Sequence, residues 1–266
     1  MKRVLLFLMI TELATMVAFG QKKETRSVSG FTGINASSVF NITVSKGNTE
    51  SLIIEADDNV MPYVRSEVRN GVLHLYIDNN KQAKNIKILK ASIVMKNLDN
   101  VTLSGACKFT TNDLFTPEKF KVDCSGASGI EVNLNTGQLN LEASGASKIR
   151  IKANITGNTG LNVSGTSKIQ GELKAANVEL SSSGVCSVEL TGSADDFKID
   201  VSGVSKIMAE DFIVKTANIK SSGSGKITVN ATNALKVNAS GASSVNYKGS
   251  PSIELNKSQA VKIRNI

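Results

Sequence analysis

A serine-glycine pair recurs through the chain at a spacing of about 20 residues, and it constrains the fold more than any other feature. Successive glycines of the pair lie 18 to 21 residues apart. A fixed period of this length in β-rich sequence is typical of stacked coils, each built from one supersecondary unit. The eight pairs are Ser104-Gly105, Ser125-Gly126, Ser144-Gly145, Ser164-Gly165, Ser183-Gly184, Ser202-Gly203, Ser222-Gly223 and Ser240-Gly241.

Apolar residues flank every pair in a fixed register. The residues four positions before and four positions after each glycine are all apolar, whereas their outer neighbours are mostly polar, as Glu142 and Arg150 are around Gly145. Alternation with a period of two on both sides of a glycine predicts two half-buried strands joined by a corner. Two residues after the glycine, each coil has Cys, Ser or Gly, which are small enough for a tight, stacked bend.

One coil cannot fold alone. It buries about five apolar side chains, worth roughly 8–15 kcal/mol, whereas ordering about 20 residues costs at least about 20 kcal/mol. Neighbouring coils must therefore supply hydrogen bonds and cover the apolar rows. The sequence predicts an all-β fold, a right-handed parallel β-helix (solenoid) of about eight rungs of 18–21 residues with a strand-rich N-terminal cap. Whether each coil has two faces or three stays open.

Three segments are expected along the chain. Residues 1–20 start with Lys2-Arg3, continue with a largely apolar stretch and end in small residues, which predicts a secretory signal peptide cleaved before Gln21; a retained membrane anchor is the alternative. Residues 21–98 lack the period and are expected to cap the rod. Residues 99–266 are expected to form the β-helix, ending in a degenerate rung where Ser258-Gln259 replaces the pair.

Within the N-terminal segment, alternation and β-branching predict four strands. They cover residues 38–45, 51–56, 72–78 and 85–96. Between the second and third strands, Met61 to Arg69 is expected to form a short helix. Asp58 or Asn59 would cap it, and the adjacent Asp57-Asp58-Asn59 cluster is read as capping and turn chemistry.

Short motifs in this segment resemble a known family. The motifs are Phe31-Thr32-Gly33-Ile34-Asn35, Val39-Phe40-Asn41-Ile42-Thr43-Val44, Glu55-Ala56-Asp57-Asp58-Asn59 and Asn70-Gly71-Val72-Leu73. Together with the Ser-Gly-Ala-Ser corners they are similar to the GIN-domain family, whose members are described as auto-transporter adhesin head domains in exported proteins of Bacteroidetes. The resemblance implies an all-β, β-helical fold and an exported location, in the periplasm or at the cell surface. It implies no site residues.

Residue types needed for catalysis are sparse. His74 is the only histidine, so a Ser-His-Asp triad or a multi-histidine metal site is hard to build, and it is expected to be a solvated strand residue. Asp123 and Glu142 share a register position and would lie about 4.8 Å apart, near the separation in retaining glycosidases. No aromatic or arginine cluster accompanies them. The corner serines are expected to satisfy backbone groups. No catalytic residue, cofactor or metal ligand is assigned, and an enzyme is not expected.

The number of cysteines and the net charge limit the classes of protein and partner that the sequence is compatible with. Cys107, Cys124 and Cys186 are an odd count, so they are expected to be buried thiols, with a Cys107–Cys124 bridge as the alternative. The net charge is +8, or +7 without residues 1–20. This charge favours acidic glycans or lipid head groups, but without a run of five basic residues nucleic acid is not an expected partner. No stretch after residue 20 is apolar enough to span a membrane.

Lysine recurs three residues after the glycine in five of the eight coils. These residues are Lys108, Lys148, Lys168, Lys206 and Lys226. In a solenoid they would project from one face, where neighbours repel by up to ~1 kcal/mol in water. The row is read either as a solubilising device that discourages aggregation or as a ladder for an anionic ligand.

The sequence therefore predicts a non-enzymatic, exported cell-envelope binding or adhesin-like module. Its expected partners are acidic polysaccharide or lipopolysaccharide, of envelope or host origin, or another envelope protein. The alternatives are a polysaccharide-acting β-helix enzyme or lectin, and a purely architectural periplasmic protein. A cleft with clustered Asp, Arg and aromatic residues would favour the enzyme, whereas flat ladders would favour the module.

Overall fold

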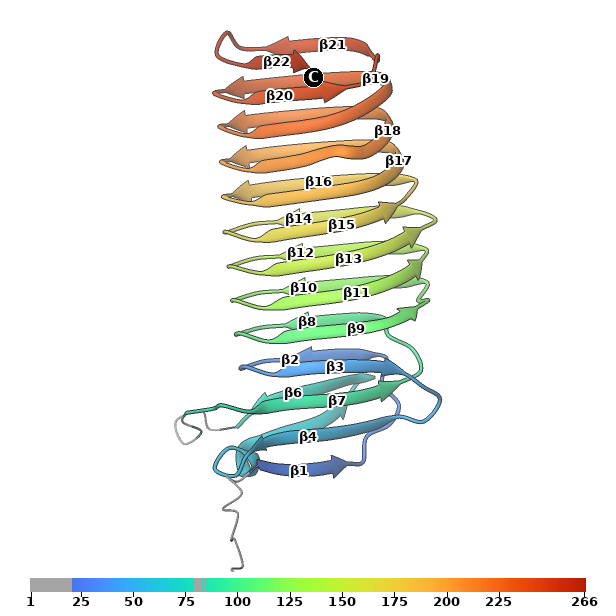
Figure 1. The fold of residues 1–266 in the computed structure, drawn as a ribbon, viewed down its shortest axis with the longest axis vertical. Helices are drawn as coiled ribbons and strands as arrows, with labels where there is room; N and C mark the ends of the chain where they lie inside the picture. Colours follow the sequence, from blue (N-terminus) through green and yellow to red (C-terminus); the bar gives the residue numbers. More distant parts are fainter. Residues whose placement is uncertain (1–20, 79–82, 84) are drawn as a thin grey trace, which may run out of the picture.

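The computed structural model describes residues 21–78, 83 and 85–266, which form a rod of stacked coils (Figure 1). Each coil has one strand before the serine-glycine corner and one after it. The first strands form a back sheet and the second a front sheet, and the chain rises as a right-handed helix from the N-terminal to the C-terminal end (Figure 1). The predicted right-handed parallel β-helix is confirmed, and each coil has two faces.

The back sheet consists of strands that pair in parallel along the rod, with one antiparallel strand at the N-terminal end. In spatial order they are β5 (Val64–Arg69), β6 (Val72–Ile77), β2 (Gly33–Ala36), β8 (Asn100–Leu103), β10 (Lys119–Cys124), β12 (Gln138–Ala143), β14 (Asn158–Val163), β16 (Asn177–Gly184), the second halves of β17 (Ser187–Gly203), β18 (Lys206–Gly223) and β19 (Lys226–Gly241), and β21 (Ser252–Lys257).

The front sheet has the same organisation, with antiparallel pairs at its N-terminal end. In spatial order its strands are β1 (Gln21–Arg26), β4 (Ser51–Asp57), β7 (Leu89–Met95), β3 (Asn41–Lys46), β9 (Lys108–Phe115), β11 (Gly129–Thr136), β13 (Lys148–Ile155), β15 (Lys168–Lys174), the first halves of β17, β18 and β19, β20 (Ser244–Lys248) and β22 (Lys262–Asn265).

The corner glycines have a backbone conformation and a packing that exclude a side chain. Gly145 has φ +70°, in the left-handed region that favours glycine. A Cβ atom on Gly145 would lie 2.5 Å from the carbonyl oxygen of Gly126 in the preceding coil. The corner backbone continues the hydrogen-bond ladder, since the Ala146 amide donates to that same oxygen at 2.7 Å. A side chain at this corner would therefore clash with the backbone of the preceding coil.

The space between the two sheets holds one continuous apolar core. All sixteen apolar positions four residues from the corner glycines are at most 3% exposed. Small residues two positions after the glycine also face inward, and the Ser147 hydroxyl donates to the Ser144 carbonyl at 2.7 Å. The predicted inward and outward registers are confirmed.

A further coil at the N-terminal end has no glycine at its corner. Strands β2 and β3 are joined by Ser37-Ser38, and Ser38 adopts φ +82° in the place of a corner glycine. This coil lies between β8–β9 and β6–β7, although it precedes β6 and β7 in sequence. Residues 21–98 thus contribute a coil to the rod as well as covering its end. The boundary between residues 98 and 99 stays a prediction.

The four strands expected in this segment are present as β3, β4, β6 and β7, but the expected helix is wrong. Met61–Tyr63 forms one 3-10 turn, η1, and β5 follows directly as an antiparallel partner of β6. Neither Asp58 nor Asn59 caps a helix, because the N-cap residue is Val60 without a side-chain hydrogen bond. Pairing with β6 satisfies the backbone groups of residues 64–69, which outweighs their local helical preference.

The degenerate C-terminal rung is confirmed. Strand β21 pairs in parallel with β19 and β22 with β20, so Ser258-Gln259 takes the place of the corner pair. No other coil of the described residues covers this rung. Ile253 and Leu255, which continue the inward rows of Leu235 and Val237, are therefore 42% and 47% exposed.

Candidate functional site

The five predicted lysines form one row on the front sheet. Each is the first residue of its front-sheet segment, at the edge next to the corners, and each is exposed. Lys148 and Lys168 are register partners, as are Lys206 and Lys226. Adjacent members are therefore about 4.8 Å apart at the backbone. The structure brings these residues together as predicted, while their role in binding stays a prediction.

The row extends beyond these five residues at both ends. Lys90 in β7 and Lys262 in β22 occupy the same register. We use the term lysine row for these seven residues, Lys90, Lys108, Lys148, Lys168, Lys206, Lys226 and Lys262. The sequence contained a signal for Lys262, three residues after the degenerate corner, but none for Lys90. The period does not reach Lys90, and its pairing with Asn41 joins strands far apart in sequence.

Six members of the lysine row have no carboxylate partner in the described part of the chain. Lys90 pairs with Glu55 at 3.1 Å, but no ion pair includes the other six. Elsewhere on the rod some lysines are paired, as Lys152 with Glu172 at 2.7 Å and Lys198 with Glu179 at 2.6 Å, whereas others, such as Lys121 and Lys220, form no ion pair with the described residues. What distinguishes the lysine row is that its six unpaired members share one register at one edge of the front sheet.

The next outward row of the front sheet carries both signs of charge and is connected by hydrogen bonds. Arg150 Nε donates to Gln170 Oε1 at 3.3 Å, and Gln170 Nε2 donates to Glu189 Oε2 at 3.0 Å. Glu131 precedes Arg150 in the same row. This row can therefore accept hydrogen bonds as well as donate them.

A hollow lies in the front sheet where the lysine row is interrupted. Gly129 is the register partner of both Lys108 and Lys148, so the row lacks a side chain there. The hollow has a volume of about 620 Å³. Lys108, Lys148, Lys168, Glu131, Arg150 and Gln170 line it, with small corner residues on the other side.

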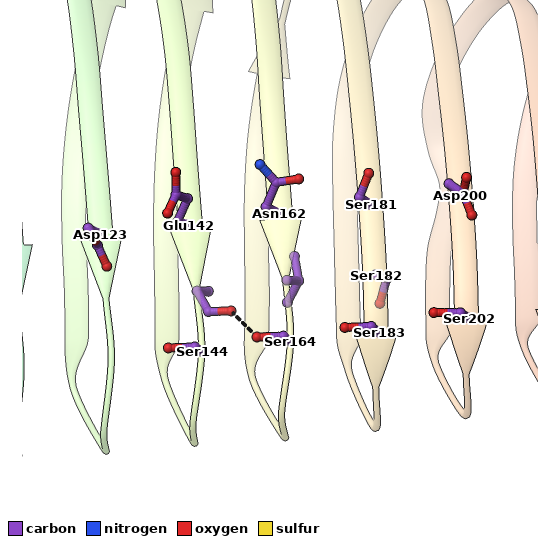
Figure 2. Close-up of a pocket in the computed structure, with 12 residues that line it drawn as sticks. Asp123, Glu142, Ser144, Asn162, Ser164, Ser181, Ser182, Ser183, Asp200 and Ser202 are labelled. Carbon is purple, nitrogen blue, oxygen red and sulfur yellow. Dashed lines mark hydrogen bonds between the residues drawn. The ribbon is translucent and has the colours of Figure 1, made fainter.

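The carboxylates considered for catalysis line a shallower hollow on the back sheet, of about 430 Å³ (Figure 2). Asp123 and Glu142 are register partners, as predicted. Figure 2 shows one row of Asp123, Glu142, Asn162, Ser181 and Asp200 beside a parallel row of Ser144, Ser164, Ser183 and Ser202. This lining contains no arginine, lysine, histidine or aromatic residue. The lining therefore offers carboxylates and hydroxyls, but no imidazole, no cation and no aromatic platform for a sugar.

Two corner serines donate hydrogen bonds from their hydroxyl groups to backbone carbonyls. Ser125 Oγ donates to the Leu103 carbonyl at 3.3 Å, and Ser164 Oγ donates to the Ala143 carbonyl at 3.4 Å. Both acceptors belong to the preceding coil. The hydroxyls thus support stacking, in agreement with the predicted role.

His74 and the Asp57 cluster have structural surroundings. His74 lies half-buried on β6, opposite Glu67, and is separated from Asp123 by Asn35 and Thr102 in the same outward row. The Asp57 carboxylate accepts hydrogen bonds from the amides of residues 87 and 88, at 2.7 and 3.0 Å. It therefore anchors the segment before β7 instead of capping a helix.

The three cysteines are free, buried thiols. The expectation of buried thiols is confirmed, and the alternative Cys107–Cys124 bridge is not formed. Burial raises the pKa of the Cys124 thiol to about 12, with smaller contributions from Asp123 and Cys107. Burial also raises the pKa of Cys107. Both thiols are therefore protonated near neutral pH, which makes them poor nucleophiles.

Two further classes of site have no support within the described residues. They contain no group of three or more His, Cys, Asp or Glu side chains arranged to hold a metal ion. None of their helices has the length and apolar character required to cross a membrane.

The model of one protein family matches most of this chain. Its description is "Putative auto-transporter adhesin, head GIN domain", and it matches residues 30–159 and 151–251. No curated protein matches the chain.

Several solved structures are similar along almost their whole length. An adhesin-like protein from Parabacteroides merdae has a TM-score of 0.69 and 21% identity, covering 92% of this chain and 96% of that one. A similar protein from Parabacteroides distasonis has a TM-score of 0.71 and 19% identity, covering 94% and 98%. Another from P. distasonis, described as a "Putative lipid binding protein", has a TM-score of 0.66 and 22% identity, covering 92% and 96%. These similarities establish the shared fold.

Proposed function

Since the chain belongs to the family described as "Putative auto-transporter adhesin, head GIN domain", we propose that it is an exported, non-enzymatic binding module of the cell envelope that holds acidic polymers on its lysine row. The family supports an adhesin-like role. The acidic ligand is proposed from the charge and spacing of this chain's own residues.

Export is supported by the family and by the N-terminal sequence. The expected signal peptide, residues 1–20, lies outside the described residues and stays a prediction. Cleavage before Gln21 would leave β1, the outermost strand of the front sheet, as the start of the mature chain. The ligand would then be met in the periplasm or at the cell surface.

The observation that carries the proposal is the absence of carboxylate partners along the lysine row. Six lysines share one register, and none belongs to an ion pair in the described part of the chain. Like charges about 5 Å apart repel one another by up to ~1 kcal/mol in water. A polymer that carries phosphates or carboxylates would relieve this repulsion at the adjacent pairs Lys148/Lys168 and Lys206/Lys226. Acidic polysaccharide and lipopolysaccharide have this chemistry, and the similar structure described as a lipid binding protein is compatible with the latter.

An enzyme receives less support from the geometry. The lysine row and the carboxylates Asp123 and Glu142 lie on opposite sheets. A polysaccharide bound on the lysine row would therefore not reach these carboxylates. A binding module does not need the lysines and these carboxylates at one site.

Replacing four lysines of the row with glutamine tests the proposal. The change Lys148→Gln, Lys168→Gln, Lys206→Gln and Lys226→Gln should weaken binding to purified lipopolysaccharide at least about tenfold at low salt. The loss should shrink at high salt, because exposed charges are screened within about 8–10 Å at physiological ionic strength. Affinity is measured by surface plasmon resonance at the two salt concentrations.

A matched control removes four charges from the back sheet. Lys119, Lys121, Lys198 and Lys220 lie there and can be changed to glutamine together. This variant should bind lipopolysaccharide almost as the wild type does. Equal affinities for all three proteins would reject the lysine row as a binding site and leave it as a solubility device.

A further inference from the structure

Gly129 interrupts the lysine row, and we propose that the hollow at this position is a binding site for a single acidic sugar unit, one that carries a phosphate or a carboxylate. The inference rests on the proposed function, because the sugar would be one unit of the polymer held by the row. It adds a place where the polymer is recognised by shape as well as by charge.

Nothing in the backbone or the packing requires glycine at position 129. Of the glycines that the structure describes, Gly129 alone has neither a positive φ nor a neighbour that would lie within 3.4 Å of an added Cβ atom. Its Cβ would meet only the Lys148 carbonyl oxygen, at an ordinary 3.5 Å. The register partners Lys108 and Lys148 both have long side chains at the equivalent position. Because glycine weakens a strand, its presence here is explained by the space that it leaves.

The size of that space suits a small ligand. The hollow has a volume of about 620 Å³, within the roughly 300–1,000 Å³ of typical ligand sites. Side chains from four successive front strands, β9, β11, β13 and β15, line it. Its floor is the backbone around Gly129, where a ligand can approach the sheet closely.

The cations around the hollow are available for an anion. Lys108, Lys148 and Lys168 project into its lining and form no ion pair with the described residues. Arg150 uses Nε to donate to Gln170, so the hydrogen bond places its guanidinium at the wall. Gln170 is in turn held by Glu189. This wall is therefore preorganised, which reduces the entropic cost of binding.

Glu131 distinguishes a sugar from a bare anion. Its carboxylate lines the same hollow and would repel an isolated phosphate, but it accepts hydrogen bonds from hydroxyl groups. A ligand that combines one anionic group with several hydroxyls can satisfy the lysines and Glu131 together. An acidic sugar has this combination.

Titration with small sugars tests the inference directly. The wild type is titrated by NMR with glucose 1-phosphate, glucuronate, glucose and inorganic phosphate. At least one of the two acidic sugars should bind with a Kd of about 1 mM, and comparison of the two identifies the anionic group. Glucose and inorganic phosphate should each bind at least about tenfold more weakly, because each lacks one half of the recognised chemistry.

Gly129→Lys separates shape from charge. The substitution makes the row continuous from Lys108 to Lys168 and adds a positive charge, but its side chain fills the hollow. Affinity for the acidic sugar should fall at least about tenfold. Ser244→Lys is the matched control, because Ser244 is the register partner of Lys226 and Lys262, far from the hollow, and the variant adds the same charge elsewhere in the row. It should keep the sugar affinity within about twofold, since a screened, distant charge has little effect. If Gly129→Lys lowers the melting temperature sharply, Gly129→Ser repeats the test.

Three outcomes would overturn the inference. They are unchanged or tighter sugar binding by Gly129→Lys, binding of glucose or inorganic phosphate as tight as that of the better acidic sugar, and no binding of either acidic sugar at about 10 mM. None of them affects the proposed function if the four-lysine variant still loses lipopolysaccharide. Conversely, lipopolysaccharide binding that does not depend on the lysines would reject the proposed function whatever the sugars do.

Discussion

Ile149 and Arg150 are neighbours in β13 but face opposite sides of the front sheet. Ile149 is 1% exposed and packs in the core, whereas Arg150 is exposed. Ile149→Ala should lower the free energy of unfolding by roughly 2–5 kcal/mol, because it leaves a cavity. Arg150→Ala should lower it by less than about 0.5 kcal/mol. Urea unfolding of both variants provides the measurement, and equal shifts in midpoint would contradict the assigned register.

At the scale of the element, the corner glycine Gly145 and the strand glycine Gly129 should respond differently to substitution by alanine. Gly145→Ala should destabilise the protein by at least about 1–2 kcal/mol, because a left-handed conformation is unfavourable for alanine and its Cβ would lie 2.5 Å from the Gly126 oxygen. Gly129→Ala should instead be neutral or stabilise by about 0.5–1 kcal/mol, because it removes the entropic penalty of glycine in a strand. Thermal melts of the two variants compare them. Equal destabilisation would mean that Gly129 has a structural role and would weaken the argument for its hollow.

At the scale of the whole molecule, the two ends of the rod differ. At the N-terminal end, β2–β3 is covered on both sides by strands from elsewhere in the chain. At the C-terminal end, β21 and β22 each have a single neighbouring strand and leave Ile253 and Leu255 exposed. Because each coil contacts only its neighbours, local opening should start where a neighbour is missing.

Hydrogen exchange should therefore be graded along the rod. Amides of β21 and β22 should exchange first, those of β11 to β15 last, and those of β2 and β3 close to the central coils. Hydrogen–deuterium exchange with mass spectrometry measures this gradient. Uniform exchange along the chain would indicate that the rod opens as one cooperative unit.

The repeated part of the chain could be predicted from the sequence alone, and the reason is physical. A strand face has a period of two and a left-handed corner favours glycine, so both leave local marks that eight coils repeat. The inward and outward registers, the fold and five members of the lysine row followed from these marks. Family resemblance agreed with them, although it identified no site residue.

Pairing between strands that are distant in sequence determined the features that the repeat did not predict. The Ser37-Ser38 corner lacks the glycine signal, and the placement of β2–β3 between β8–β9 and β6–β7 depends on strands that are distant in sequence. Residues 64–69 became a strand because β6 was available as a partner. Lys90 joined the lysine row in the same way. The hollow at Gly129 is formed by side chains from four strands, so only stacking could reveal that a single missing side chain leaves room for a ligand.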